Sequence, residues 1–545
     1  MTEVLPKNVN QVTKKIYRSR QEIGRTRIAF QELIKPQIGK SQRSASQLLK
    51  VPRSTIQSWK TARTPSEIEE EVDQFFASPV GSKYLHRIVL AATTVISFGG
   101  SGVRGIQEFL RLSKLHHWVA SSTGALYGWI GLVEENIALF GKEQTRLLAK
   151  NMPLKKISIV EDESFHHGRP CLVAIEAVSN FIFVERYVKE RSKEAWDLAV
   201  RDGLKDLQVK IVQSTSDEGK AILSHVKHEL NAEHSPDLFH VQQELTRATT
   251  APLSAQEKEF ELLAEKAKQQ LDRTIQKHGE GSSHAIEVEY NHRCRNAGLE
   301  FRKKRRQKVK EAIKQIGRDY HPINIITGQW QNPEEVKARL ERSMEEVETA
   351  CREAVLSESS QKRVKKARGA LTAMVGYFVF FYHLLTEYMA SLQLSPEQEK
   401  FLGDVLIPLA YMERIYIRGS KNEKEEMQTI MDALRKRARE GPWTEDERKN
   451  MMQKAEEAAG FFQRSSSCVE GRNAWLRMKH DGFHRLSDRK LTALTVMHNF
   501  HIRRRDGTTA AERFFRKNHI NLFEWLVDEV QMLGWPRKAR QKLAV

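Results

Sequence analysis

The sequence has 545 residues, of which 40% are hydrophobic, and 89 Lys and Arg residues against 70 Asp and Glu residues give a formal net charge of +19. This composition excludes a wholly disordered chain, and the positive charge favours an acidic partner such as a nucleic acid. The four cysteines stand far apart without a CxxC pair, which disfavours a disulfide framework or a zinc ribbon.

The excess positive charge lies at the two ends of the chain. Residues 1–60 hold 13 basic and 3 acidic residues, and residues 461–545 hold 17 and 8. Residues 157–250 hold 11 basic and 16 acidic residues, so an acidic block lies between two basic ends. We expect the basic ends to bind the phosphates of a polyanion and the acidic block to hold divalent metal.

Residues 1–64 are predicted to form a helix-turn-helix DNA-binding region. Residues 44–51 have the pattern of a short helix, Pro52 and Arg53 that of a turn, and residues 54–60 that of a second helix. The alternative is an ordinary helical hairpin, but the local charge favours a second helix that enters a major groove. The side chains expected to face DNA are Arg53, Thr55, Gln57, Ser58 and Lys60.

Residues 65–150 are predicted to form a second helical region. An acidic helix and linker come first, and the helical pattern that follows is broken at Gly99–Gly102. The segments 103–114 and 121–140 then form a pair of helices. This pair is either a second DNA-binding motif or plain core.

The hydrophobic period changes at residue 157, where the first part of a catalytic core, residues 151–250, is predicted. Three β-rich stretches separated by short turns precede alternating helices and strands, in the order β-β-β-α-β-α-β-α. This order predicts an RNase H-like mixed sheet. The predicted strands are 156–164, 169–179, 181–191, 209–215 and 237–241.

Residues 251–460 are predicted to form an all-α insertion domain, because so long a segment without a strand signal is not a loop. Residues 369–386 are uncharged and reach the lower limit for a membrane span, but strongly charged flanks favour a buried helix. Trp330 either packs in a core or stacks on a flipped base. Residues 461–545 complete the core with helices and a basic tail, so the fold class is α+β and dominated by helix.

Acidic residues stand at the ends of two predicted strands. Asp162 lies at the end of the first strand and Asp217 follows the fourth. In an RNase H-like sheet these strands are neighbours, so the two carboxylates would meet. Facing carboxylates repel each other unless a cation lies between them, and oxygen ligands suit Mg²⁺ or Mn²⁺. Two such ions about 3.5–4 Å apart can activate a water or a 3′-hydroxyl and stabilise the leaving oxygen of a phosphodiester.

A third acid, Glu470, lies in the first turn of a helix predicted after the insertion and capped by a run of serines. On the same helix Arg472, Asn473 and Arg477 are expected to face a DNA phosphate. His240, near the end of the fifth predicted strand, either contacts DNA, orders a metal-bound water or simply packs.

Three other acids adjoin those chosen and are alternative ligands. They are Glu161, Glu163 and Glu218. Neighbouring residues of a strand point to opposite faces, so only one of Glu161 and Asp162 can point into the site.

With these features the chain resembles a bacterial insertion-sequence transposase of the DDE type, whose RNase H-like core is interrupted by a helical insertion before the final Glu. The strand order, the placement of the acids and the stretch SSSCVEGRNAWL carry the resemblance over residues 145–545. It implies that Asp162, Asp217 and Glu470 are the catalytic triad and hold two Mg²⁺ or Mn²⁺ ions. The Tyr-x2-Arg-x3-Glu-x6-Lys signature of one transposase group is absent, since Gln463 and Ser466 stand at its Tyr and Arg positions.

The resemblance implies a DNA transposase that binds terminal inverted repeats, cleaves a strand by water attack and joins the 3′-hydroxyl to target DNA. Two DNA ends need two active sites, so we expect a homodimer or a larger assembly on DNA. No phosphate-binding GxxxxGK[ST] motif occurs, so no nucleotide cofactor is expected. We also expect a cytoplasmic, nucleoid-associated protein without a membrane partner. The alternatives are a catalytically inactive RNase H-like repressor and a structure-specific nuclease without strand transfer.

Overall fold

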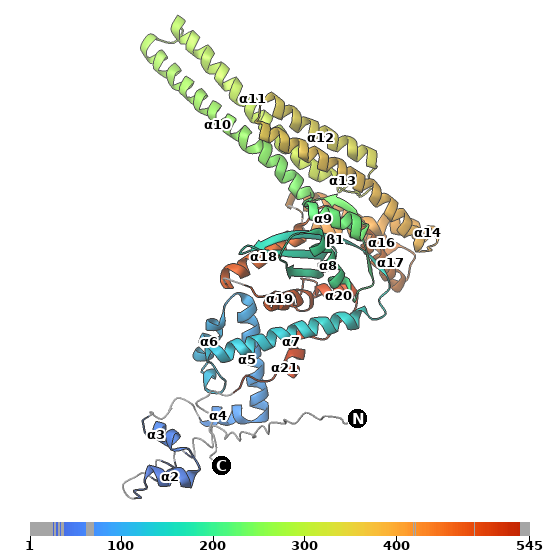
Figure 1. Ribbon diagram of the computed structural model, residues 1–545. Coiled ribbons are helices and arrows are strands. Elements are labelled where there is room, and N and C mark those ends of the chain that lie inside the picture. Colours follow the sequence, from blue (N-terminus) through green and yellow to red (C-terminus); the bar gives the residue numbers. More distant parts are fainter. Residues whose placement is uncertain are drawn as a thin grey trace. The chain divides into compact units, whose positions relative to one another are not determined.

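The computed structural model describes residues 38–61, 70–417, 419, 421–483 and 486–534, with Thr26, Ala29, Phe30 and Leu33. The chain forms two compact units, each discontinuous in sequence. Unit 1 comprises Met1–Gln144, Leu476–Ile502 and Asn518–Val545, and unit 2 comprises Thr145–Trp475 and Arg503–Lys517. The predicted final segment 461–545 therefore contributes to both units. The fold is α+β and dominated by helix, with one mixed sheet (Figure 1).

Unit 1 is helical throughout its described residues. Its elements are α2 (Gln42–Leu49), α3 (Arg53–Thr61), α4 (Glu70–Ala77), α5 (Pro79–Gly99), α6 (Val103–Leu112), the 3-10 helix η1 (Leu115–His117), most of α7 (Thr123–Ala149), the second half of α18 (Ser467–Phe483), α19 (Asp488–Phe500) and α21 (Leu522–Glu529). The predicted break after α5 is confirmed, because Gly100 ends the helix with a φ of 110° that favours glycine.

Helices α2 and α3 form the predicted N-terminal pair and enclose a small core that includes Phe30 and Ile56. Helix α3 begins at Arg53, one residue earlier than predicted, because the Pro52 carbonyl already accepts the N–H groups of Thr55 and Ile56. Arg53 and Gln57 are exposed and Thr55 is half-buried. The side chains of Ser58 and Lys60, the basic tail and most of residues 1–37 lie outside the described residues.

The sheet lies in unit 2 and has the order β3-β2-β1-β4-β5. Strands β1, β2 and β3 pair antiparallel, whereas β1–β4 and β4–β5 are parallel. The prediction that the first and fourth strands are neighbours is confirmed. The strands are β1 (Lys155–His166), β2 (Arg169–Glu176), β3 (Ile182–Tyr187), β4 (Val209–Ser216) and β5 (Glu233–Pro236).

The predicted position of the fifth strand, residues 237–241, is wrong. Strand β5 ends at Pro236, and helix α10 begins at Leu238. Asp237 is the N-cap of that helix: its carboxylate accepts the Phe239 N–H at 2.7 Å, which ends the strand and starts the helix. Between the strands lie α8 (Lys193–Leu204), α9 (Lys220–His225) and the π-helix η2 (Val226–Leu230).

The long region between β5 and α18 is helical, as predicted. Within its described residues an isolated bridge between Ile323 and Trp330 is the sole β-pairing. Helices α10 and α11 run side by side as a long arm, with α12 and α13 beside its base (Figure 1). The remaining helices of unit 2 are α10 (Leu238–His278), α11 (Ser283–Asp319), α12 (Pro333–Glu353), α13 (Glu358–Ser391), α14 (Pro396–Phe401), the π-helix η3 (Leu402–Leu406), α15 (Ile407–Tyr416), α16 (Lys421–Glu440), α17 (Glu445–Gly460), the first half of α18, and α20 (Ala510–Phe515).

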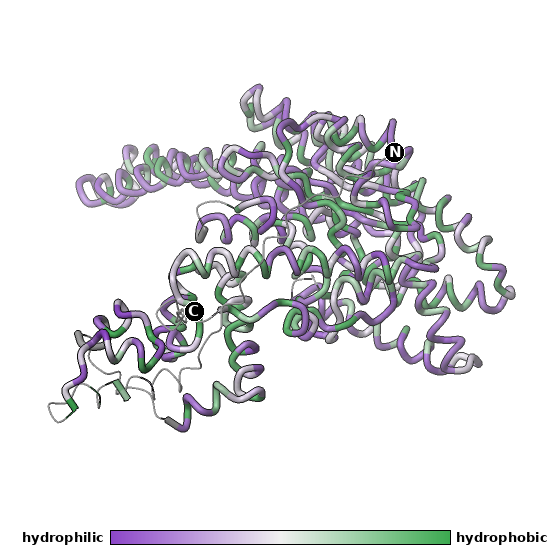
Figure 2. The backbone as a smooth tube through the Cα atoms, turned by 60° about the horizontal axis from the view of Figure 1, so that its bottom comes forward, coloured by the Kyte–Doolittle hydropathy of each residue, from purple (hydrophilic) through white to green (hydrophobic). Residues whose placement is uncertain are grey.

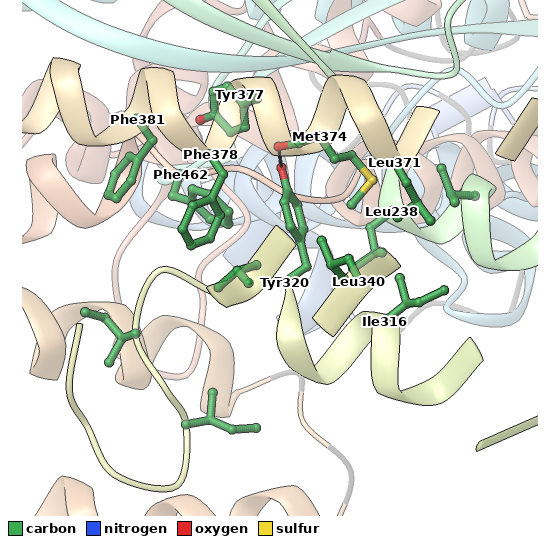
Figure 3. Packing of buried hydrophobic residues seen from close by; sticks show 14 of the residues in the cluster. Leu238, Ile316, Tyr320, Leu340, Leu371, Met374, Tyr377, Phe378, Phe381 and Phe462 are labelled. Carbon is green, nitrogen blue, oxygen red and sulfur yellow. Dashed lines mark hydrogen bonds between the residues drawn. The ribbon is translucent and has the colours of Figure 1, made fainter. Parts of the chain in front are cut away.

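Helix α13 is the one described helix that is long and apolar enough to cross a membrane. It lies in the core of unit 2, where Tyr377, Phe378 and Phe381 pack around Phe462 (Figure 3). The Tyr320 hydroxyl donates to the Met374 carbonyl at 3.0 Å in the same cluster. Hydrophobic and hydrophilic residues alternate along most helices (Figure 2), and α13 has the buried aromatic face of a core helix, as predicted for this stretch.

Trp330 packs against the same core. Its ring stacks on Phe381, and its indole N–H donates to the Gly403 carbonyl at 2.9 Å. These contacts support the core position.

Candidate functional site

Asp162 and Asp217 lie where the parallel pairing of β1 with β4 stops. Val160 of β1 pairs with Thr215 of β4, so Asp162 and Asp217 both stand two residues beyond this pair. Strand β5 adds a third acid, because Ser216 pairs with Pro236 and Asp237 follows directly. The prediction that Asp162 ends the first strand is wrong, because β1 continues to His166 in its antiparallel pairing with β2. Asp162 instead lies just past the parallel pairing with β4, level with the acids that follow β4 and β5.

Helix α18 lies over the face of the sheet to which Asp162 points. Asp162, Val173 and Glu185 stand in register across β1, β2 and β3, so their side chains share a face. Asn473 donates from Nδ2 to Asp162 Oδ2 at 2.7 Å. Arg472 forms a buried bidentate pair with Glu185, with N···O distances of 2.7 and 2.5 Å. Two successive residues of α18 therefore hold the helix to β1 and β3.

These contacts change the interpretation of two predicted DNA contacts. Arg472 is buried and its guanidinium is bound to Glu185, and Asn473 is bound to Asp162, so neither side chain lies at the surface. Both position the site in this structure. Arg477, one turn further along α18, is exposed.

Asp162 is close enough to the other two predicted acids for their charges to act on it. Burial, together with a smaller contribution from repulsion by Glu470 and Asp217, raises the pKa of Asp162 from 3.8 to about 7. The Glu163 N–H, at 2.8 Å, and His240 oppose this rise. The charges of Glu470 and Asp217 thus both act on Asp162, so the three predicted carboxylates lie near one another.

His240 lies between two acids of the site. Its Nε2 is 3.4 Å from Glu470 Oε1 and 3.8 Å from Asp237 Oδ2. The hydrogen bond with Glu470 raises the pKa of His240, and burial opposes this effect. Glu470 is part-exposed, so it can be reached by a ligand from solvent.

Asp237 was missed in the sequence because its strand was placed four residues too late. The side chain is buried, and its Oδ2 accepts the backbone N–H of Ser466 at 3.1 Å as well as the Ser466 hydroxyl. Burial raises the pKa of Asp237, and these hydrogen bonds oppose the rise. Asp237 therefore joins β5 to the segment before α18.

The three alternative acids lie in different surroundings. Glu161 is buried on the opposite face of the sheet, as strand alternation predicts, and accepts the Ser214 hydroxyl at 2.5 Å. Glu163 accepts the Trp196 indole N–H at 2.9 Å and pairs with Arg191 at 3.0 Å, also away from α18.

Glu218 stays beside the site. It lines a small open pocket at the end of β4, and burial raises its pKa while the charge of Lys366 opposes this. The residues lining this pocket include Ser216, Asp217, Glu218, Asp237, His240, Glu244 and Lys366.

The donor set is chemically suited to a hard divalent cation, although the side chains do not surround one point. No group of three or more His, Cys, Asp or Glu side chains is gathered closely enough to hold a metal ion in the described part of the chain. Two observations fit a cation nonetheless. The mutual repulsion at Asp162 is what a cation would relieve, and the buried Asn473 Oδ1 has no hydrogen-bond partner.

A family model matches the C-terminal part of the chain. No curated protein matches it. Residues 402–542 match a family model described as a family of unknown function, DUF6399, and this segment holds Glu470 and Asn473 but neither Asp162 nor Asp217.

Proposed function

We propose that this protein is a DNA transposase of the DDE type, in which Asp162, Asp217 and Glu470 hold two Mg²⁺ or Mn²⁺ ions. One observation carries the proposal: Asp162 and Asp217 each stand two residues past the last parallel pair of β1 and β4 in a β3-β2-β1-β4-β5 sheet, and Glu470 is close enough to raise the pKa of Asp162. This strand order supports an RNase H-like core. The helical region between β5 and α18 would be the helical insertion that precedes the final Glu in transposases of this type.

The chemistry of the site follows from its charges. Divalent cations would supply an activated water or 3′-hydroxyl and stabilise the leaving oxygen of a phosphodiester. Asp162 must lose its proton to act as a ligand, and the converging charges that raise its pKa make the cation-free site unfavourable. Asn473 orients Asp162, and the buried Arg472–Glu185 pair fixes the helix that carries Glu470.

The N-terminal pair α2–α3 would serve as the helix-turn-helix that binds terminal inverted repeats. Arg53 and Gln57 are exposed at the start of α3, which is where a recognition helix contacts base edges. We propose a cytoplasmic protein that acts on double-stranded DNA as a homodimer or larger assembly, since each DNA end needs its own active site.

The test is Mg²⁺-dependent nicking of a labelled duplex that carries the DNA flanking the gene. We expect the wild type to nick at the element end, and Asp162→Asn to abolish nicking while an electrophoretic shift still reports binding. Nicking that persists in Asp162→Asn would show that the site is assigned wrongly. A pre-cleaved 3′-hydroxyl end should yield product joined to target DNA; hydrolysis without joining would indicate a structure-specific nuclease.

A catalytically inactive DNA-binding repressor is the second candidate. The observation that favours it is that the acids do not surround one point in the described residues. It predicts specific binding to the flanking DNA without nicking at any Mn²⁺ concentration.

A further inference from the structure

Asn473 and Glu470 lie one turn apart on the same side of α18. Residues three apart on a helix are neighbours on its surface, so both side chains lie on the side of α18 that contacts β1 at Asp162. Asn473 reaches Asp162, and Glu470 is close enough to act on the charge of Asp162. A single turn of α18 thus places one amide and one carboxylate beside the acid of the first strand.

The amide of Asn473 has a fixed orientation. An ionised Asp162 offers only lone pairs, so the NH₂ group of Asn473 must face it, as the 2.7 Å contact shows. The amide oxygen then points away from Asp162. Asn473 is 8% exposed, and its Oδ1 has no hydrogen-bond partner. A buried carbonyl oxygen without a protein partner is unfavourable unless a water or an ion binds it.

The nearest basic residue along the helix does not satisfy this oxygen. Arg472, the preceding residue, is held by Glu185 and cannot donate to it. The site already holds three carboxylates, so a fourth acid would add to the repulsion at Asp162. An amide oxygen is a hard ligand for divalent cations and brings no charge.

We infer that Asn473 is a neutral oxygen ligand, direct or through one water, of the divalent cation held by Asp162 and Glu470. This inference rests on the proposed function, since it requires that the carboxylates bind a cation. It makes Asn473 part of the metal site rather than a contact to the DNA phosphate.

The test measures Mn²⁺ binding to the full-length, DNA-free protein, by electron paramagnetic resonance of the free ion. Asn473→Leu removes both the amide oxygen and the hydrogen bond to Asp162. Asn473→Asp also removes that hydrogen bond but keeps an oxygen. We expect Asn473→Leu to weaken Mn²⁺ binding about tenfold or more, and Asn473→Asp to bind Mn²⁺ at least as tightly as the wild type.

The matched control is Glu163→Gln, an acid next to Asp162 that is engaged with Trp196 and Arg191 on the other face. We expect it to leave Mn²⁺ binding unchanged. Circular dichroism checks that each variant is folded, and Asn473→Ala replaces Asn473→Leu if the leucine is not accommodated.

The outcomes separate the inference from the proposed function. Equal losses in Asn473→Leu and Asn473→Asp would mean that Asn473 only orients Asp162, and unchanged binding in Asn473→Leu would mean that it has no role; either result overturns the inference. In both cases loss of Mn²⁺ binding in Asp162→Asn would leave the proposed metal site standing. Absence of Mn²⁺ binding to the wild type would overturn both.

Discussion

The two faces of the sheet carry adjacent acids on β1 in contrasting surroundings. Glu161 and Asp162 both have a pKa raised to about 7. On one face burial alone raises the pKa of Glu161, and the hydroxyl of Ser214 opposes the rise. On the other face burial acts together with repulsion from Glu470 and Asp217.

A raised pKa therefore does not identify the site by itself. The charges of the neighbouring side chains distinguish the two acids. His225, 3.5 Å from Glu161, has a pKa lowered by burial, so a neutral ring faces a buried acid there. Around Asp162 anionic groups converge from β4 and α18 instead. Acids with shifted pKa values cluster at functional sites. Of these two acids, Asp162 is the one whose anionic neighbours would be stabilised by a bound cation.

The largest expected difference between the faces is in catalysis. If the proposed function holds, Asp162→Asn should reduce Mg²⁺-dependent nicking by about 10³-fold or more, because it removes a proposed ligand of the cations. Glu161→Gln should reduce nicking by less than about tenfold, since it changes a side chain enclosed on the opposite face. Initial nicking rates at saturating Mg²⁺ measure both, and comparable losses would contradict the assignment of the α18 face.

The same contrast holds for stability on β3. Glu185 lies on the α18 face in a buried pair with Arg472, whereas Arg186 lies on the other face in an exposed pair with Asp202. Glu185→Ala should lower the free energy of unfolding by about 3–5 kcal/mol, because it leaves a buried guanidinium without its partner.

The matched control is Arg186→Ala, which should cost less than about 1 kcal/mol. Urea unfolding followed by circular dichroism measures both. A small effect of Glu185→Ala would show that Arg472 can reach solvent, and α18 would then not be fixed as described.

The sequence predicted four of the five strands and the adjacency of β1 and β4, because alternation of apolar residues is a local signal. Strand β5 has the sequence EHSP, four residues without a β-branched or aromatic side chain, so its place is decided by pairing with β4. Missing it also hid Asp237 as an acid of the site.

The roles of Arg472 and Asn473 could not be read locally either. Their partners Glu185 and Asp162 lie 287 and 311 residues away along the chain. In the sequence both residues resemble DNA contacts, because they lie in a basic segment. The register of β1, β2 and β3 puts Asp162 and Glu185 on one face of the sheet, and the contacts of Arg472 and Asn473 with these acids show that both residues face the sheet. The hydrophobic periodicity of a helix carries no information about contacts between residues so far apart in the sequence.

The pH dependence of stability offers a smaller but more specific test of the two faces. The pKa of Asp162 is about 7 in the folded chain against an ordinary value of 3.8, so Asp162 binds more protons in the folded chain between these values. Stability without metal should therefore fall as the pH rises from about 4 through 7. Asp162→Asn should remove this loss and be about 1–3 kcal/mol more stable than the wild type at pH 8 without metal.

Mg²⁺ distinguishes this effect from the same one at Glu161. Glu161→Gln should also stabilise the metal-free protein at pH 8, since burial raises the pKa of Glu161 similarly. Added Mg²⁺ should raise the melting temperature of the wild type and of Glu161→Gln, but not that of Asp162→Asn. Thermal melts at pH 5 and pH 8 with and without Mg²⁺ measure these changes in melting temperature. A rise in the melting temperature of Asp162→Asn with Mg²⁺ would contradict the proposal that Asp162 binds the cation.

The smallest expected effect concerns a lysine at the pocket. Lys366 of α13 lines it together with Asp217 and acts on the charge of Glu218, whereas Lys365, the next residue back, is exposed and does not line the pocket. A DNA strand bound at the proposed metal site would bring a phosphate close to this lysine. Lys366→Ala should weaken binding of the duplex end by about 3–10-fold and lower the salt slope of binding by about 1.

Lys365→Ala removes the same charge from the same helix and should leave both quantities nearly unchanged. Titration by fluorescence anisotropy over a range of salt concentrations measures the two variants together. Equal weakening would mean that α13 attracts DNA through its overall charge. A loss confined to Lys366→Ala would instead place the DNA strand at the acid-lined pocket, and so extend the difference between the two faces of the sheet from metal binding to substrate binding.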